Sequence, residues 1–328
     1  MTTHILPTAS RGLAGLQDWA RLDTEEVSVS PSPGYEALTQ PPLGFPSSIE
    51  GPMAWSGEEG GSFNAYTLEL GPGDVVEIEQ AIKHFLSMCL GLDGGEVARW
   101  NFPLPTLGPQ LQDCAVNIHR GSGLCIIRGL TPSVYSAEDN AIIFLGLASY
   151  IGENRGVQSS KGAMLTHVYE SSTWTVPREE RHGIHTNSSL PFHNDMGYGR
   201  IPNLLPAQKD ALALLQQTAT AQQVQLPTRQ GDMVFINNWG VLHARDSYED
   251  DDTVSRHLVR LWLRNSELGW EIPESMKTPW EAAFGAKAKK IVNRQYPVEP
   301  MPEYIESKFT NGSAAFVMEE SDEDEEAS

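Results

Sequence analysis

The order of helical and strand patterns is the feature that most limits the fold of this 328-residue chain. Asp74 can cap a helix over residues 74–89, and Ser136 can cap another that runs to about residue 150. A third helix is expected to begin near Pro206. Four segments are typical of strands: residues 122–128, 224–226, 233–237 and 256–264. Helices followed by a concentration of strands predict an α+β fold around a β-rich barrel or sandwich.

The charge of the chain excludes some classes of partner. It has 43 acidic and 23 basic residues and a net charge of −20 at pH 7. The last ten residues, 319–328, hold seven acids and no base, so the rest of the chain is acidic as well. This composition argues against binding nucleic acid through a basic surface and against electrostatic docking on anionic membranes. We therefore expect a small-molecule substrate, no nucleic-acid or membrane partner, and a chain compatible with a homo-oligomer.

Cysteine usage and hydropathy indicate the cellular compartment. The three cysteines show no CxxC spacing, so a disulfide scaffold or a cysteine-rich zinc site is not expected. The first residues lack the apolar stretch of a signal peptide, and the longest apolar run, residues 141–151, is too short to cross a bilayer. These features predict a soluble, cytoplasmic protein.

Three regions of different composition are visible along the chain. Residues 1–50 contain closely spaced prolines and little periodicity, so they are expected to be weakly structured. Residues 51–318 carry the periodic patterns and are expected to form one folded domain. Residues 319–328 are expected to be a disordered acidic tail.

The segment around His193 is the most informative for function. His193 and Asp195 are two residues apart, so in a strand their side chains would point to the same face and could bind one cation. His243, which follows the strand pattern of residues 231–238, is the best candidate for a third ligand. Two histidines and one carboxylate on one side of a metal leave the opposite positions open, as non-haem Fe(II) oxygenases require.

Two arginines near the C-terminal end of the chain could bind an anion. Arg256 and Arg260 are four residues apart in a strand pattern, which places them on the same face. A guanidinium in that position could hold a carboxylate through a bidentate pair.

Together, these motifs resemble the taurine catabolism dioxygenase family, and most closely its fungal members. The similar segments are Phe-His-Asn-Asp-Met-Gly, Gly-Asp-Met-Val-Phe-Ile-Asn-Asn, Val-Leu-His-Ala-Arg-Asp and Arg-His-Leu-Val-Arg-Leu-Trp-Leu-Arg. The resemblance implies a double-stranded β-helix (jelly roll) with flanking helices in residues 51–318. It also implies an Fe(II) enzyme that couples decarboxylation of 2-oxoglutarate by O₂ to hydroxylation of a small organic molecule. For fungal, taurine hydroxylase-like members this chemistry points to secondary metabolism.

The resemblance assigns roles to individual residues. His193, Asp195 and His243 match the iron ligands. Arg256 matches the arginine that pairs with the distal carboxylate of 2-oxoglutarate, and Arg260 matches an arginine close to the substrate anion. No catalytic side chain is expected beyond this metal centre.

One departure from the family affects the expected activity. Only 48 positions separate Asp195 from His243, an interval that in the family is far longer and carries several barrel strands. We therefore expect an incomplete jelly roll and weak turnover. The alternative is a catalytically impaired descendant kept as a binding or structural protein. A third interpretation is a zinc hydrolase that uses His182, His185 and His193.

Overall fold

The structure is a computed structural model. It describes residues 48–57, 66–88, 97–159, 161–170, 177, 181, 183–195, 205–250, 255–285 and 294–301, together with the backbone of residues 2–7. The helices are α1 (Pro72–Ser87), α2 (Leu107–Arg120), α3 (Ala137–Ile151), α4 (Pro206–Gln222) and α5 (Lys277–Phe284). The strands are β1 (Thr2–Pro7), β2 (Thr67–Glu69), β3 (Leu124–Arg128), β4 (Asn154–Gly156), β5 (Leu165–Tyr169), β6 (Leu190–His193), β7 (Val224–Pro227), β8 (Met233–Ile236), β9 (Val241–Arg245) and β10 (His257–Arg264).

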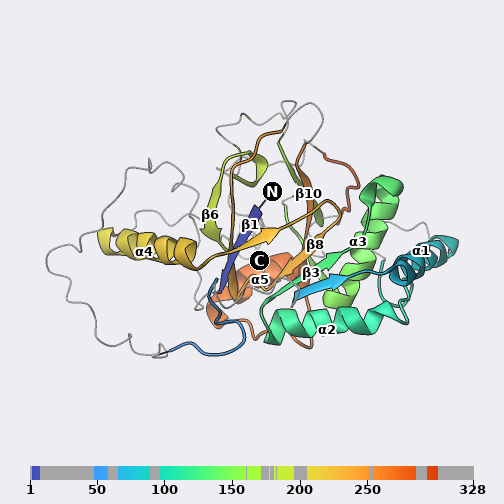
Figure 1. Cartoon of the computed structure of the whole chain (residues 1–328), viewed down its shortest axis with the longest axis horizontal. Coiled ribbons are helices and arrows are strands. Elements are labelled where there is room, and N and C mark those ends of the chain that lie inside the picture. Colours follow the sequence, from blue (N-terminus) through green and yellow to red (C-terminus); the bar gives the residue numbers. More distant parts are fainter. Residues whose placement is uncertain are drawn as a thin grey trace, which may run out of the picture.

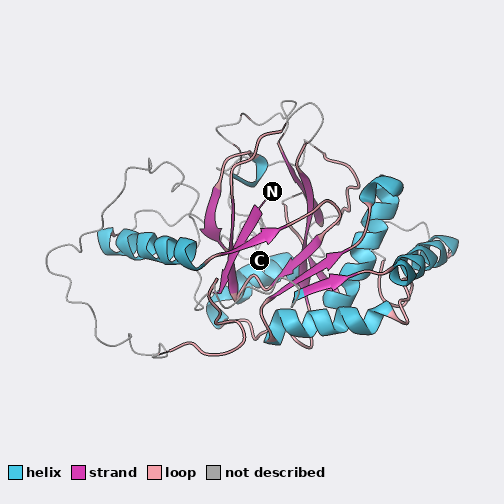
Figure 2. Cartoon of the chain, viewed as in Figure 1, coloured by secondary structure: helices cyan, strands magenta, loops and turns pink. Residues whose placement is uncertain are grey.

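The strands form three small sheets at the centre of the molecule (Figure 1). One is antiparallel with the order β6-β9-β1-β7, and a second is antiparallel with the order β4-β10-β5. The third has the order β2-β3-β8, with β2 parallel to β3. Helices lie around the outside of these strands (Figure 2). The prediction of an α+β fold with flanking helices is confirmed, and the division into three small sheets is compatible with the expected incomplete jelly roll.

The largest apolar core lies between β3 and the helices α1, α2 and α3. The hydroxyl of Ser136 accepts a hydrogen bond from the backbone N–H of Asp139 at 3.0 Å, which confirms the predicted cap of α3. Leu145 and Leu147 of this helix are fully buried. Gly146 allows the ring of Phe102 to approach closely, since a Cβ at this position would lie 2.5 Å from a ring carbon. This core packs against β3 and so supports the β2-β3-β8 sheet.

A smaller core positions the strands that carry the candidate metal ligands. The buried side chains of Phe192 on β6 and of Leu242 and Ala244 on β9 pack against Ala219 of α4. Successive side chains in a strand point to opposite faces, so His193 and His243 are directed to the other side of the sheet. The apolar contact with α4 thus fixes which face of β6 and β9 presents the imidazoles.

Several features of the fold differ from the sequence-based expectations. Helices α2 and α5 and strands β2, β4 and β5 were not expected, because their apolar patterns are short or interrupted. Residues 2–7 form β1, although they belong to a segment expected to be weakly structured. The rest of that segment up to residue 47 and the acidic tail at 319–328 lie outside the described residues, so the predicted domain division stays a prediction.

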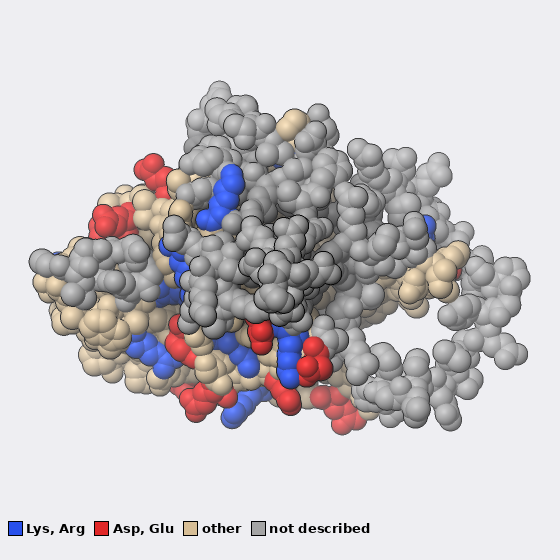
Figure 3. All heavy atoms as spheres, turned by 180° about the vertical axis from the view of Figure 1, so that it is seen from behind, with Lys and Arg blue, Asp and Glu red and all other residues tan. Residues whose placement is uncertain are grey.

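Two further observations concern the surface and the helices. No helix in the described ranges is long and apolar enough to cross a membrane. On the face seen in Figure 3, the acidic and basic side chains that the structure describes are interspersed.

We predict that replacing Asp232 destabilises the fold because its carboxylate neutralises a buried guanidinium. Asp232 accepts hydrogen bonds from Nε and Nη2 of Arg128, at 2.9 and 2.7 Å, and the two side chains are 2% and 7% exposed. Asp232→Ala should cost about 3–5 kcal/mol of unfolding free energy, because Arg128 would stay buried and keep, among the described residues, only the exposed carboxylate of Glu69, 3.8 Å from its Nη1, as an anionic partner. Glu274→Ala, which breaks the exposed pair with Lys277, should cost about 0–1 kcal/mol. Denaturant unfolding of both variants tests this, and equal losses would contradict it.

Candidate metal centre

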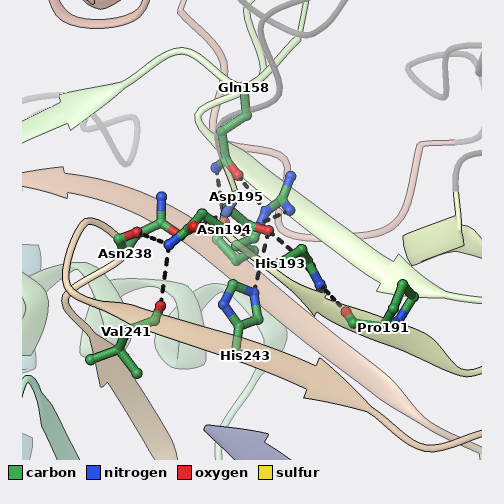
Figure 4. Close-up of polar contacts among 9 residues, drawn as sticks. Gln158, Pro191, His193, Asn194, Asp195, Asn238, Val241 and His243 are labelled. Carbon is green, nitrogen blue, oxygen red and sulfur yellow. Dashed lines mark hydrogen bonds and ion pairs between the residues drawn. The ribbon is translucent and has the colours of Figure 1, made fainter. Parts of the chain in front are cut away.

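The structure brings the three predicted ligands together. His193 ends β6, Asp195 lies two residues beyond it, and His243 is in the middle of β9. His193 and His243 are directly opposite each other in the antiparallel pair, and their ring centroids are 4.3 Å apart. One potential ligand atom of each of the three residues lies within 4.8 Å of the others. Figure 4 shows the two imidazoles and the carboxylate pointing toward one another.

The hydrogen bonds of the imidazoles determine which nitrogen faces the centre. Nδ1 of His193 lies 2.7 Å from the backbone carbonyl of Pro191, and a carbonyl can only accept a hydrogen bond. Nδ1 therefore carries the proton, and Nε2 of His193 is the free acceptor that faces Asp195 at 3.6 Å. Nε2 of His243 lies 3.4 Å from the same carboxylate oxygen, Oδ1. Nδ1 of His243 is buried and has no hydrogen-bond partner among the described residues.

The other carboxylate oxygen of Asp195 accepts a hydrogen bond from Arg260, and Arg260 is itself held by Gln158. Nη1 of Arg260 donates to Oδ2 of Asp195 at 3.0 Å, while Nε of Arg260 donates to Oε1 of Gln158 at 2.9 Å (Figure 4). The amide nitrogen of Gln158 donates in turn to the backbone carbonyls of Met164 and Arg260. Arg260 on β10 thus links the β4-β10-β5 sheet to Asp195, which follows β6 of the other antiparallel sheet. Oδ1 of Asp195 remains directed at both imidazoles.

Asparagine side chains join the two segments that carry the ligands. The backbone N–H of Asp195 donates to Oδ1 of Asn238 at 2.7 Å. The side-chain amide of Asn194 donates to the backbone carbonyls of Asn238 and Val241. The His193–Asp195 segment is therefore fixed to the turn that leads into β9. Asn238, the second of the two asparagines that end the β8 strand motif, therefore helps to hold the ligand segment.

The pKa values in this cluster favour a carboxylate at Asp195 and a neutral imidazole at His243. Burial by itself would raise the pKa of Asp195, but the charge of Arg260, followed by the neighbouring imidazoles, outweighs it and holds this pKa well below its usual range. Burial and the neighbouring His193 lower the pKa of His243. An ionised carboxylate and a neutral imidazole are the forms that coordinate a metal.

A second cationic cluster lies beyond His243 along β9. Arg245 is buried and shares the face of His243, and its Nη2 donates to the backbone carbonyls of Thr186 and Ser188. The guanidiniums of Arg245 and Arg256 each lie 5.2 Å from the ring centroid of Tyr248. Burial, followed by the charge of Arg256, lowers the pKa of Arg245 to about 10. Two cations around one aromatic ring make this cluster suited to binding an anion.

Arg256 still has free donors in this cluster. Its Nε and Nη1 atoms and the hydroxyl of Tyr248 are buried and have no hydrogen-bond partner among the described residues. Burial lowers the pKa of Arg256, which means that its charge lacks full compensation by neighbouring anions. A carboxylate ligand would satisfy these donors and offset the cost of burying the charge.

The sequence analysis located the ligands but not the residues that hold them. His193, Asp195 and His243 converge, although Asp195 lies outside the strand in which it was expected. Arg260 contacts Asp195 directly, and Arg256 lies in the separate cluster with Tyr248. The holding residues Gln158, Asn194, Asn238, Arg245 and Tyr248 were not identified, although Asn194, Asn238 and Arg245 lay within motifs that had been recognised. His182 of the proposed zinc set lies outside the described residues.

We predict that this cluster binds iron. Purified wild-type protein should take up about one Fe(II) per chain under anaerobic conditions, because two imidazoles and a carboxylate suit this ion. His193→Ala should weaken binding by more than about 100-fold, since loss of a holding residue alone typically costs 10–100-fold. His84→Ala, a change in an exposed histidine of α1, is the control and should bind iron like the wild type. Equal iron content in the His193→Ala variant and the wild type would exclude this assignment.

Comparisons with known proteins agree with the sequence motifs. Residues 200–262 match the model of the taurine catabolism dioxygenase TauD, TfdA family. This stretch contains His243, Arg256 and Arg260, and it begins just after Asp195. The taurine hydroxylase-like protein SAT17 of Stachybotrys chartarum is 27% identical over 347 residues, which cover 77% of this chain and 89% of that protein.

The alignment with the Stachybotrys protein also shows a difference in length. The covered 77% of this chain is about 253 residues, which leaves about 94 of the 347 aligned positions without a residue of this chain. The relative therefore has a substantial number of residues with no counterpart here. This agrees with the expectation that the chain lacks part of the family's barrel.

Solved structures of two iron oxygenases are also similar in part. Asparagine oxygenase (AsnO) is 14% identical, with a TM-score of 0.44, over 60% of this chain and 92% of that chain. The non-haem iron oxygenase OrfP in complex with Fe and alpha-ketoglutaric acid is 14% identical, with a TM-score of 0.40, over 62% of this chain and 95% of that chain. The match of residues 200–262 and the similarity to the Stachybotrys protein confirm the resemblance carried by the motifs: this chain is similar to members of the taurine catabolism dioxygenase TauD, TfdA family.

Proposed function

We propose that this protein is an Fe(II)- and 2-oxoglutarate-dependent dioxygenase that hydroxylates a small organic molecule. The observation that carries the proposal is the convergence of His193, Asp195 and His243 on one side of a common centre. The relation to the taurine dioxygenase family supports it. Two nitrogens and one oxygen leave coordination positions for a bidentate co-substrate and for O₂.

The cluster of Arg256 and Tyr248 supports 2-oxoglutarate as the co-substrate. A dicarboxylate that binds the metal with its keto-acid end needs a cation for its distal carboxylate. Arg256 has buried N–H groups without partners among the described residues. It also lies against the same tyrosine ring as Arg245, which is only two residues beyond the ligand His243.

The chain's own residues have separate tasks in this proposal. Iron bound to the three ligands would supply O₂ activation coupled to conversion of 2-oxoglutarate into succinate and CO₂. The carbonyl of Pro191 fixes the tautomer of His193, and Arg260 orients the carboxylate of Asp195. Because Arg260 already binds Asp195, we propose that it both positions this ligand and faces the substrate. Arg256 anchors the co-substrate.

We predict that Arg256→Gln weakens 2-oxoglutarate binding about 10- to 100-fold, because a charge-assisted bidentate contact is worth about 1.5–3 kcal/mol. Iron binding should be unchanged, since Arg256 contacts none of the three ligands in the described structure. Calorimetric titration of the iron-loaded protein with 2-oxoglutarate measures both properties. The matched control is Arg120→Gln, which removes an exposed arginine at the end of α2. An unchanged affinity in Arg256→Gln would show that the anion binds elsewhere.

Turnover tests the enzymatic proposal itself. Wild-type protein should form succinate from 2-oxoglutarate in an Fe(II)- and O₂-dependent manner, slowly on its own and faster with a suitable small-molecule substrate. His193→Ala should reduce this to background. Succinate formation by the wild type no greater than that of His193→Ala would overturn the proposal.

The substrate is proposed only as a class. The name of the Stachybotrys protein and the position of Arg260 near the metal centre favour a small molecule that carries an anionic group. A role in fungal secondary metabolism and a cytoplasmic location remain predictions from the sequence. The alternative of a catalytically impaired descendant is not favoured, because all three ligands are in place.

A further inference from the structure

The strand order of the metal-binding sheet contains an unusual neighbour. β1, from the N-terminal end of the sequence, lies between β9 and β7, which come more than 200 residues later. It is antiparallel to both, and Ile5 lies opposite His243 on one side and Val224 on the other. Figure 1 shows this strand, in dark blue, among the yellow and orange strands. β9, the strand that carries the candidate ligand His243, is thus paired with a strand from a distant part of the chain.

β1 is the more regular of the two partners of β9. Five consecutive residue pairs join β1 to β9, from Thr3 opposite Arg245 to Pro7 opposite Val241. The pairing of β9 with β6 has a register shift and is recorded only at Leu190 and at His193. On its other side β1 is the one described neighbour of β7. If β1 were absent, β9 would have a free edge and β7 would lose its place in this sheet.

The short interval after Asp195 explains why this position needs another strand. Most of the described residues between Asp195 and β8 belong to α4 and β7. The Stachybotrys relative has about 94 aligned positions without a counterpart in this chain. A barrel strand that followed Asp195 would be available to pair with β9, whereas this chain places β1 there.

We propose that the gap between β9 and β7 is a strand-acceptor site, and that residues 2–7 of the same chain fill it by β-strand addition. The added strand replaces a barrel strand that the short interval does not supply. Backbone hydrogen bonds provide the binding, as in other cases of strand addition to a sheet. Occupancy keeps β9 in the register that places His243 opposite His193. This last point rests on the proposed metal centre, whereas strand addition itself does not.

A designed disulfide tests whether the strand lies there. His4 is opposite Gln225, an exposed residue of β7. Directly paired strand residues are close enough for a disulfide. The full-length His4→Cys/Gln225→Cys variant should form this bond under mild oxidation, and peptide mass mapping distinguishes it from bonds to native cysteines. His4→Cys/Gln223→Cys, in which the second cysteine is two residues earlier in the chain and just before β7, is the matched control and should cross-link far less.

The result of cross-linking decides between the possible occupants. A bond within one chain supports the proposal. A bond between two chains, seen as a dimer on a non-reducing gel, would overturn it, because a second copy would then supply the strand. Equal cross-linking of the matched and shifted pairs, or none in either, would also overturn it.

A backbone substitution tests what the strand does. In full-length Ile5→Pro, the proline cannot donate to the sheet, whereas Ile5→Val keeps the N–H group and a β-branched side chain. Amide exchange in β7 and β9 should become at least 10-fold faster in Ile5→Pro, with β5 and β10 unchanged and Ile5→Val like the wild type. Unchanged exchange in β7 and β9 would refute strand addition.

Iron affinity separates the two parts of the proposal. In Ile5→Pro it should fall about 10-fold or more, an effect like that of losing a holding residue. Faster exchange with unchanged iron affinity would retain the strand-acceptor site and overturn its role in placing His243. If the wild type itself bound no iron, the proposed function would be wrong. The disulfide and amide-exchange results would still test strand addition.

Discussion

The carboxylate of Asp195 is the interaction on which the candidate site depends. Its Oδ1 faces both imidazoles and its Oδ2 accepts from Arg260, so one side chain joins β6, β9 and β10. The positive charge of Arg260 is the main contribution that offsets the cost of burying the carboxylate of Asp195. A divalent cation would then find an ionised carboxylate already oriented toward it. Arg260 therefore orients the carboxylate of Asp195 even when no substrate is bound.

Packing on the opposite face of the same sheet fixes the strand register on which this arrangement depends. Phe192, Leu242 and Ala244 alternate with His193, His243 and Arg245 and are buried against α4. A shift of one residue in β9 would move the apolar side chains to the metal face and the histidine into the apolar layer. The helix that occupies much of the short interval after Asp195 thus contributes directly to the register of a ligand strand. The proposed addition of β1 would act on the same strand from its edge.

The anion cluster is separate from the metal ligands but connected to them through β9. Arg245 ties the backbone before β6 to β9, and its guanidinium shares the ring of Tyr248 with Arg256. Two adjacent buried cations repel each other, which is consistent with the lowered pKa of Arg245. An anionic co-substrate would relieve this repulsion and satisfy the free donors of Arg256. Binding of a dicarboxylate is therefore favoured by the same residues that stiffen the site.

The sequence by itself determined the chemistry: His193, Asp195, His243 and the two arginines are recognisable because ligand types and strand alternation can be seen in local spacing. It also determined the major helices, since caps such as Ser136 and periodic apolar residues act within a few positions. The tertiary structure alone decided that Arg260 binds Asp195, that Gln158 and Asn238 hold the site, and that Tyr248 lies between two guanidiniums. The contacts of Arg260, Gln158 and Asn238 join residues 43 to 102 positions apart, so no local pattern encodes them. Tyr248 is near both arginines in the sequence, but its contacts with them depend on how the chain folds after β9. The position of β1 depends in the same way on which strands are left without a neighbour, a property of the assembled sheet and not of residues 2–7.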